Sequence, residues 1–100
     1  MQLDEPGLDQ RWALSPSVAL RPEPFGALAY HFGNRKLIFL KRPELVAVVR
    51  GLGSAGGDGT VRSALVAAGV PEAAWPAYLS ALAGLADSDM LRKREGKAVA

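Results

Sequence analysis

The chain has 100 residues, of which 49% are hydrophobic and 22% are charged, so it can fold around one core and is too apolar to stay disordered. Its formal net charge is only +2, and it contains no cysteine, which excludes a disulfide framework and thiolate metal sites. The acidic start MQLDEPGLDQ does not resemble a secretory signal, and no apolar run reaches the ~18 residues of a membrane span, so we expect a cytoplasmic protein without a membrane partner.

The first part of the chain predicts a small antiparallel sheet. Residues 1–11 are assigned to a flexible arm, and a first strand is expected over residues 18–21, where two following prolines end it. FGALAYHF is expected to form the second strand, and Gly33-Asn34 suits a two-residue hairpin turn. RKLIFLK then returns as the third strand.

Three helices are expected after the sheet. Pro43 suits the first position of a helix, and PELVAVVRGL places apolar residues at helical spacing. Thr60 is a suitable N-cap for a second helix that Gly69 ends. The third helix starts at about Ala73, and its many alanines leave it smooth enough to pack on a core and to wall an apolar groove with one edge. Its apolar stripe comprises Trp75, Tyr78, Leu79, Leu82 and Leu85.

These elements predict an α+β fold that is winged-helix-like, with a three-stranded antiparallel sheet followed by three helices in the order β-β-β-α-α-α. The domain is expected to occupy residues 12–91, and residues 92–100 to form a flexible basic tail.

The third strand is unusual because it is apolar on both sides. A strand that lies on one core alternates apolar and polar residues, whereas LIFL at residues 37–40 does not alternate. Either Leu37 with Phe39 or Ile38 with Leu40 should face the core, and the sequence does not distinguish the two sets. If no strand follows in the sheet, this strand also leaves main-chain N–H and C=O groups unpaired, which makes it a template for strand addition.

No motif in the chain supports bond-making chemistry. GLGSAG at residues 51–56 matches the dinucleotide-binding pattern, but it follows a helix instead of a strand, so it is interpreted as a helix–helix linker. His31 is the only histidine, and it is expected to be structural because no partner for a triad or metal site is evident. Asp87 and Asp89 are expected to be solvated at a helix end. We therefore expect neither an enzyme nor a cofactor.

Two alternatives from other classes remain open at this stage. A small winged-helix DNA-binding protein would need basic or amide side chains on a recognition helix. The second helix offers only Arg62 and Ser63, and the third has none, so no specific nucleic acid is expected. The other alternative is a dimerisation module whose third strands pair with each other.

A family resemblance centres on the run LRPEPFGALAYHFGNRKL and continues through ALVAAGVPEAAWPAYLSALAGL. Over most of residues 15–91 the chain resembles the mycofactocin peptide chaperones. These belong to the precursor-peptide recognition elements and are related to the peptide chaperones of pyrroloquinoline quinone biosynthesis. The resemblance implies a non-catalytic protein that binds the leader of a ribosomal precursor peptide as an added strand. It also implies presentation of that peptide to a radical S-adenosylmethionine maturase, which holds the cofactors itself.

Under this hypothesis the leader lies along the third strand and against the third helix. The peptide-binding residues are expected to be Lys36, Leu37, Ile38, Phe39, Leu40, Lys41, Tyr78, Leu79 and Leu82. Arg35 and Arg42 extend the basic fringe of the strand, which favours a leader that carries carboxylates.

Overall fold

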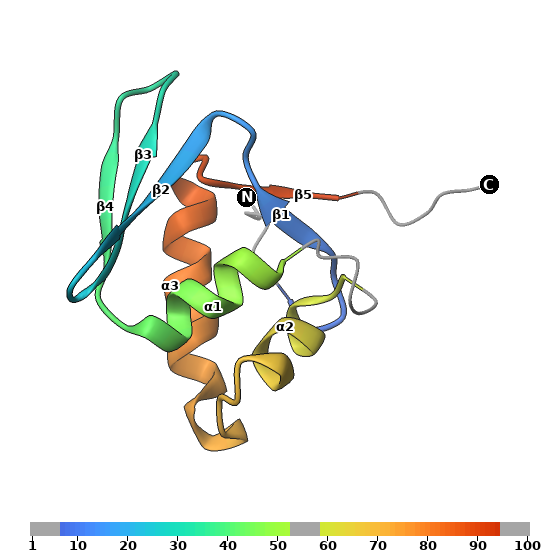
Figure 1. Ribbon diagram of the computed structural model, residues 1–100. Coiled ribbons are helices and arrows are strands. Elements are labelled where there is room, and N and C mark those ends of the chain that lie inside the picture. Colours follow the sequence, from blue (N-terminus) through green and yellow to red (C-terminus); the bar gives the residue numbers. More distant parts are fainter. Residues whose placement is uncertain (1–6, 53–58, 95–100) are drawn as a thin grey trace.

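The computed structural model describes residues 7–52 and 59–94 (Figure 1). The elements in chain order are β1 (Trp12–Leu14), β2 (Val18–Glu23), β3 (Gly26–His31), β4 (Leu37–Leu40), α1 (Pro43–Gly51), α2 (Val61–Ala67), the 3-10 helix η1 (Glu72–Ala74), α3 (Trp75–Asp87) and β5 (Leu91–Lys93). The mixed α/β class, the antiparallel pairing and the three helices agree with the prediction. The order β-β-β-α-α-α is incomplete, because a further strand lies at each end of the series.

The two additional strands form a separate two-stranded sheet. β1 pairs antiparallel with β5, so that Trp12 lies opposite Lys93 and Leu14 lies opposite Leu91. Each strand has three residues, which is too short for a visible alternation of apolar and polar positions. What holds them is burial, because Trp12 and Leu91 are both 3% exposed. Two residues of the predicted tail, Arg92 and Lys93, therefore belong to β5. In the predicted arm, the Leu8 and Gln10 carbonyls accept hydrogen bonds from the N–H groups of Arg62 and Val61 at the start of α2. Residues 1–6 and 95–100 lie outside the described residues.

The predicted three-stranded sheet is present, with strand order β2-β3-β4. β2 extends past its predicted end and includes Pro22, which is tolerated because β2 is an edge strand. The β3–β4 connection is wider than a two-residue turn. It covers residues 32–36, and Arg35 adopts the left-handed conformation with φ 65° at its end.

All three helices lie on one side of this sheet, and the β1–β5 ribbon continues from the C-terminal end of α3 (Figure 1). Pro43 begins α1 as predicted, and the Thr60 hydroxyl accepts a hydrogen bond from the Ser63 N–H at 3.2 Å as the cap of α2. The segment predicted to start the third helix is first a 3-10 turn, and α3 begins at Trp75. None of the described helices has the length and apolarity needed to cross a membrane.

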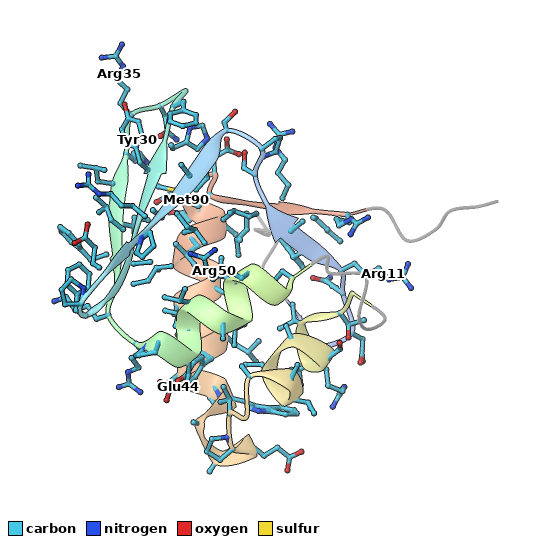
Figure 2. The ribbon with its side chains drawn as sticks, in the orientation of Figure 1. Arg11, Tyr30, Arg35, Glu44, Arg50 and Met90 are labelled. Atoms are coloured by element: carbon cyan, nitrogen blue, oxygen red, sulfur yellow. The ribbon has the colours of Figure 1, made fainter. Side chains whose placement is uncertain are left out.

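The core lies between the sheet and the helices. Its largest fully buried side chains are Leu40, Val48, Val49, Val61, Leu65, Leu82 and Met90. Figure 2 shows Met90 directed into this interior, whereas Arg35 extends away from it at the tip of the β3–β4 hairpin. The core thus takes one face of the three-stranded sheet and leaves the other face to solvent.

Candidate functional site

The two apolar sets of β4 have different surroundings. Leu40 is 2% exposed, and Ile38 is partly buried against the core. Leu37 and Phe39 point to the opposite face of the sheet, where they are 55% and 57% exposed. The core therefore takes Ile38 and Leu40, which resolves the choice that the sequence left open.

The main chain of β4 is also free along one edge. Within residues 7–52 and 59–94, β4 pairs with β3 alone. The His31 N–H donates to the Lys36 carbonyl at 3.0 Å, which marks these two residues as a hydrogen-bonded pair. Such pairs alternate along an antiparallel ladder, so Ile38 and Leu40 also bond to β3, and the N–H and C=O groups of Leu37 and Phe39 point to the open edge.

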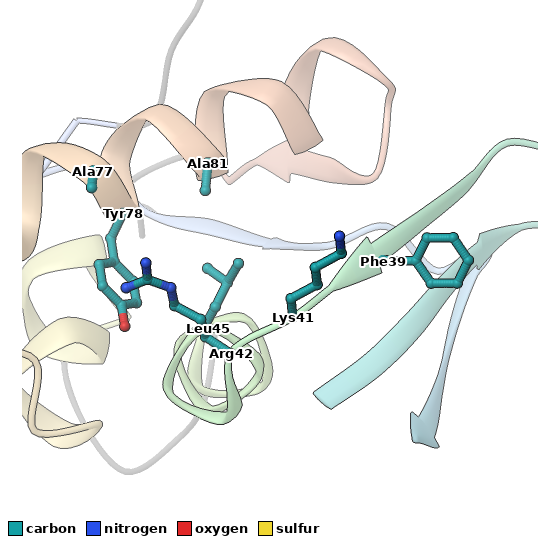
Figure 3. A pocket seen from close by; sticks show the side chains of 7 residues that line it. All are labelled: Phe39, Lys41, Arg42, Leu45, Ala77, Tyr78 and Ala81. Carbon is teal, nitrogen blue, oxygen red and sulfur yellow. The ribbon is translucent and has the colours of Figure 1, made fainter. Parts of the chain in front are cut away.

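A groove of about 260 Å³ lies beside this edge (Figure 3). Its lining residues are Phe39, Lys41, Arg42, Leu45, Ala77, Tyr78 and Ala81. Ala77 and Ala81 present only methyl groups from α3, which leaves space between the helix and the strand (Figure 3). Lys41 and Arg42 give the otherwise apolar groove a positive side.

The predicted peptide-binding residues are divided among three locations. Phe39, Lys41 and Tyr78 meet at the groove, together with Arg42 of the predicted fringe. Leu37 lies on the outer face of the sheet, while Lys36 and Arg35 are exposed at the hairpin. The residues that face the interior are Ile38, Leu40, Leu79 and Leu82, of which Leu40 and Leu82 are fully buried.

Sequence reasoning missed three lining residues. Ala77 and Ala81 are four positions apart and flank Tyr78, so they belong to the alanine-rich edge that was predicted to wall a groove. The sequence did not identify which alanines form that edge, because most of α3 is small and apolar. Leu45 of α1 was predicted only as part of a helix stripe, and no signal in the sequence marked it as a groove residue.

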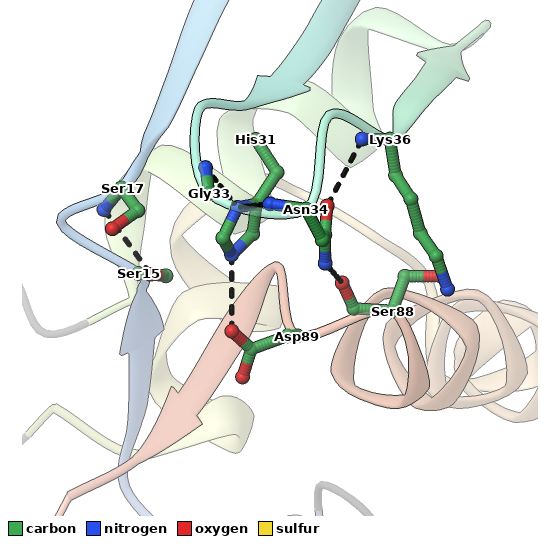
Figure 4. A network of polar contacts seen from close by, with 8 residues as sticks. All are labelled: Ser15, Ser17, His31, Gly33, Asn34, Lys36, Ser88 and Asp89. Atoms are coloured by element: carbon green, nitrogen blue, oxygen red, sulfur yellow. Dashed lines mark hydrogen bonds and ion pairs between the residues drawn. The ribbon is translucent and has the colours of Figure 1, made fainter.

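A polar network fixes the β3–β4 hairpin to the end of α3 (Figure 4). The His31 Nδ1 accepts hydrogen bonds from the backbone N–H groups of Gly33 and Asn34, at 2.9 and 3.1 Å. With Nδ1 acting as acceptor, the ring proton resides on Nε2, which lies 3.0 Å from the Asp89 carboxylate. The Asn34 side chain donates to the Ser88 carbonyl at 3.1 Å.

This network tests the predictions made for His31 and Asp89. His31 is 5% exposed and holds the hairpin, in agreement with its expected structural role. Asp89 is solvated as predicted, with its side chain 59% exposed, but its carboxylate is also the partner of the His31 ring. Sequence reasoning had no way to pair residues 58 positions apart.

The start of β3 is shaped by a close backbone approach. Gly26 has φ 151°, and a Cβ at this position would overlap the carbonyl oxygen of Leu40. Only glycine therefore allows β3 to begin this close to the end of β4, where the chain turns toward α1.

The basic residue of α2 is engaged within the fold. The Arg62 guanidinium lies 3.1 Å from the Asp9 carboxylate and 5.9 Å from the centre of the Trp75 ring. In the described part of the chain, no three His, Cys, Asp or Glu side chains are grouped so that they would hold a metal ion.

Comparisons with known proteins add a family assignment to this geometry. The family model for the peptide chaperone MftB family matches residues 11–92. A curated protein named peptide chaperone MftB from Mycobacterium ulcerans is 53% identical over 87 residues, which cover 87% of this chain and 77% of that protein.

Two further proteins of the same name give similar values. The one from Mycobacterium tuberculosis is 51% identical over 87 residues, with the same coverage of 87% and 77%. The one from Mycolicibacterium smegmatis is 52% identical over 83 residues, which cover 83% of this chain and 78% of that protein. No solved structure matches the chain significantly.

Proposed function

The chain belongs to the peptide chaperone MftB family, and on that premise we propose that it binds the leader of a ribosomal precursor peptide by strand addition to β4. We further propose that it acts without catalysis and presents the peptide to a radical S-adenosylmethionine maturase in mycofactocin biosynthesis. The observation that carries the proposal is the open edge of β4 directly beside the groove at α3.

The leader would pair with the main chain of Leu37 and Phe39, whose N–H and C=O groups point to the open edge. Alternate side chains of an added strand point to opposite faces of the sheet. One set of leader side chains would therefore enter the groove, against Tyr78 and Leu45. The other set would emerge on the outer face, beside the side chains of Leu37 and Phe39.

The groove supplies the selectivity that backbone pairing lacks. Its apolar floor includes Tyr78, which is 7% exposed, and its methyl-lined wall accepts a bulky aliphatic or aromatic side chain. Lys41 and Arg42 stand at the same groove, so a leader with a carboxylate beside its apolar anchor is favoured. Under this proposal the leader contacts Leu37, Phe39, Lys41 and Tyr78 directly, while Leu82 is a core residue that supports α3.

The expected affinity suits a carrier that must release its cargo. Burying about three large apolar side chains contributes roughly 1.5–3 kcal/mol each, and each strand hydrogen bond adds about 0.5–1.5 kcal/mol. Ordering a disordered leader costs roughly 2–5 kcal/mol. The balance corresponds to a dissociation constant of about micromolar or somewhat below.

The proposal is tested by titrating a synthetic leader of the precursor peptide into the isotope-labelled chain and following the backbone amides by NMR. We expect the largest shifts at Leu37 and Phe39, because their N–H groups acquire a new acceptor. The amides of Ile38 and Leu40 already bond to β3 and should move less. Shifts confined to α2 around Arg62, with β4 unchanged, would refute the strand-addition proposal.

A further inference from the structure

The solvent face of the three-stranded sheet carries a second apolar surface, which shares Phe39 with the proposed groove. We call it the outer-face patch, and its members are Phe25, Leu28, Tyr30, Phe32, Leu37 and Phe39. Their rings pack edge to face, Phe25 on Phe39 at 5.6 Å and Tyr30 on Phe32 at 5.4 Å between centroids. The exposed face of an antiparallel sheet is usually polar. A clustered aromatic surface of this kind marks an interaction site.

The patch becomes more apolar toward the open edge of the sheet. Strand register places Ala19, Tyr30 and Leu37 in one row across the outer face, and it places Arg21, Leu28 and Phe39 in the next. In both rows the residue on β2 is small or charged, whereas the residue on β4 is large and apolar. The patch therefore does not end in a polar border at β4. A strand added there would continue both rows with its own outward side chains.

Resting on the proposed function, we propose that the maturase docks on the outer-face patch and that the bound leader completes the docking surface. The groove lies between β4 and α3, whereas most of the patch faces away from the helices, so the leader and the enzyme lie side by side and meet at Phe39, which borders both surfaces. The enzyme then contacts chaperone and leader side chains together, in adjacent rows of one sheet.

The charges around the patch define the chemistry of the partner surface. Arg21 lies in the row of Leu28 and Phe39, but its charge is paired with the Glu23 carboxylate at 3.4 Å. Arg35 and Lys41 are exposed and flank β4 at its two ends, so the charge that remains beside the patch is positive. The complementary enzyme surface has an apolar centre and an acidic rim. A rim of opposite sign raises the association rate and orients the encounter, while the aromatic residues supply the contacts that slow dissociation.

A composite surface makes the two binding events interdependent. The enzyme should bind the leader-loaded chaperone about 10-fold more tightly than the free chaperone, within the range typical of coupled sites. Reciprocity requires that the enzyme strengthen leader binding by the same factor.

The test uses the double variant Tyr30→Thr/Phe32→Thr, which removes two rings of the patch that do not belong to the open edge. Val66→Thr on α2 is the matched control, because Val66 is 62% exposed but lies outside the patch. The dissociation constants for the synthetic leader and for the purified maturase are measured by calorimetry. We expect the double variant to bind leader within about 2-fold of the parent chain and to bind enzyme at least ~10-fold more weakly. The control should change neither value.

Unchanged enzyme affinity in the double variant, with leader binding intact, would overturn the docking inference and leave the proposed function standing. If the leader causes no amide shifts at β4 in the parent chain, the proposed function itself is overturned. If the double variant does not fold, cross-saturation from the maturase to the Leu28 methyl groups of the parent chain decides the matter, and its absence counts against docking. A concentration-dependent dimer of the free chain that the double variant abolishes would also overturn the inference, because the occupant would then be a second copy.

Discussion

Replacing Leu37 with proline should distinguish the contribution of the β4 main chain to leader binding from that of its side chains. Leu37 is the first residue of β4, and its N–H points to the open edge, so proline removes no hydrogen bond to β3. The matched variant Leu37→Ala loses the same exposed side chain and keeps the N–H. The difference between the two variants therefore measures the contribution of the backbone donor.

The magnitude follows from the proposed pairing. One lost strand hydrogen bond costs about 0.5–1.5 kcal/mol, which is about 2- to 12-fold in dissociation constant. The proline ring also occupies the space that an incoming carbonyl oxygen would take, so the loss relative to Leu37→Ala should reach or exceed the upper end of this range. Calorimetric titration with the synthetic leader gives both constants. Thermal unfolding of the unliganded variants should show that both remain folded.

A second control tests the alternation of hydrogen bonds on which this reasoning depends. Ile38→Pro removes an N–H that bonds to β3, so it should destabilise the free chain, by about 3 kcal/mol or more if the sheet tolerates proline as poorly as a helix interior does. Equal leader affinity for Leu37→Pro and Leu37→Ala would refute strand addition at this edge.

Two further predictions address the groove and the fold. Ala77→Leu should fill the groove from α3 and weaken leader binding by about 10-fold or more, whereas Ser80→Leu on the same helix, outside the groove, should not; equal affinities by calorimetry would place the leader elsewhere. Gly26→Ala should lower the free energy of unfolding by about 1–3 kcal/mol, because alanine is strained at φ 151° and its Cβ meets the Leu40 carbonyl. An unchanged urea midpoint would contradict the close approach between the start of β3 and the end of β4.

The sequence predicted the elements whose signals are local. Pro43 marked the start of α1, Thr60 capped α2, and the period of α3 identified its apolar stripe. The three-stranded sheet followed from runs of apolar residues separated by turn residues. These signals depend on backbone preferences within a few positions, which is why they are readable without a structure.

The parts that failed depend on contacts between distant positions. β1 and β5 are too short to carry a pattern, and each exists because the other lies beside it. Leu37–Leu40 is apolar at every position, so only the packed helices decide which side faces inward. In the candidate site, the chemistry of Tyr78 and Lys41 was predicted, but their meeting with Leu45 depends on the path of α1, which no local signal determines.

The fastening of the β3–β4 hairpin by His31 and Asn34 has a thermodynamic consequence for recognition. Because the hairpin that leads into β4 is tied to the C-terminal end of α3, the strand and the helix are linked before the peptide binds, so the chaperone loses less conformational entropy on binding. Most of the conformational entropy lost on binding then comes from the leader peptide. A preorganised binding site of this kind favours leaders whose side chains already fit its shape.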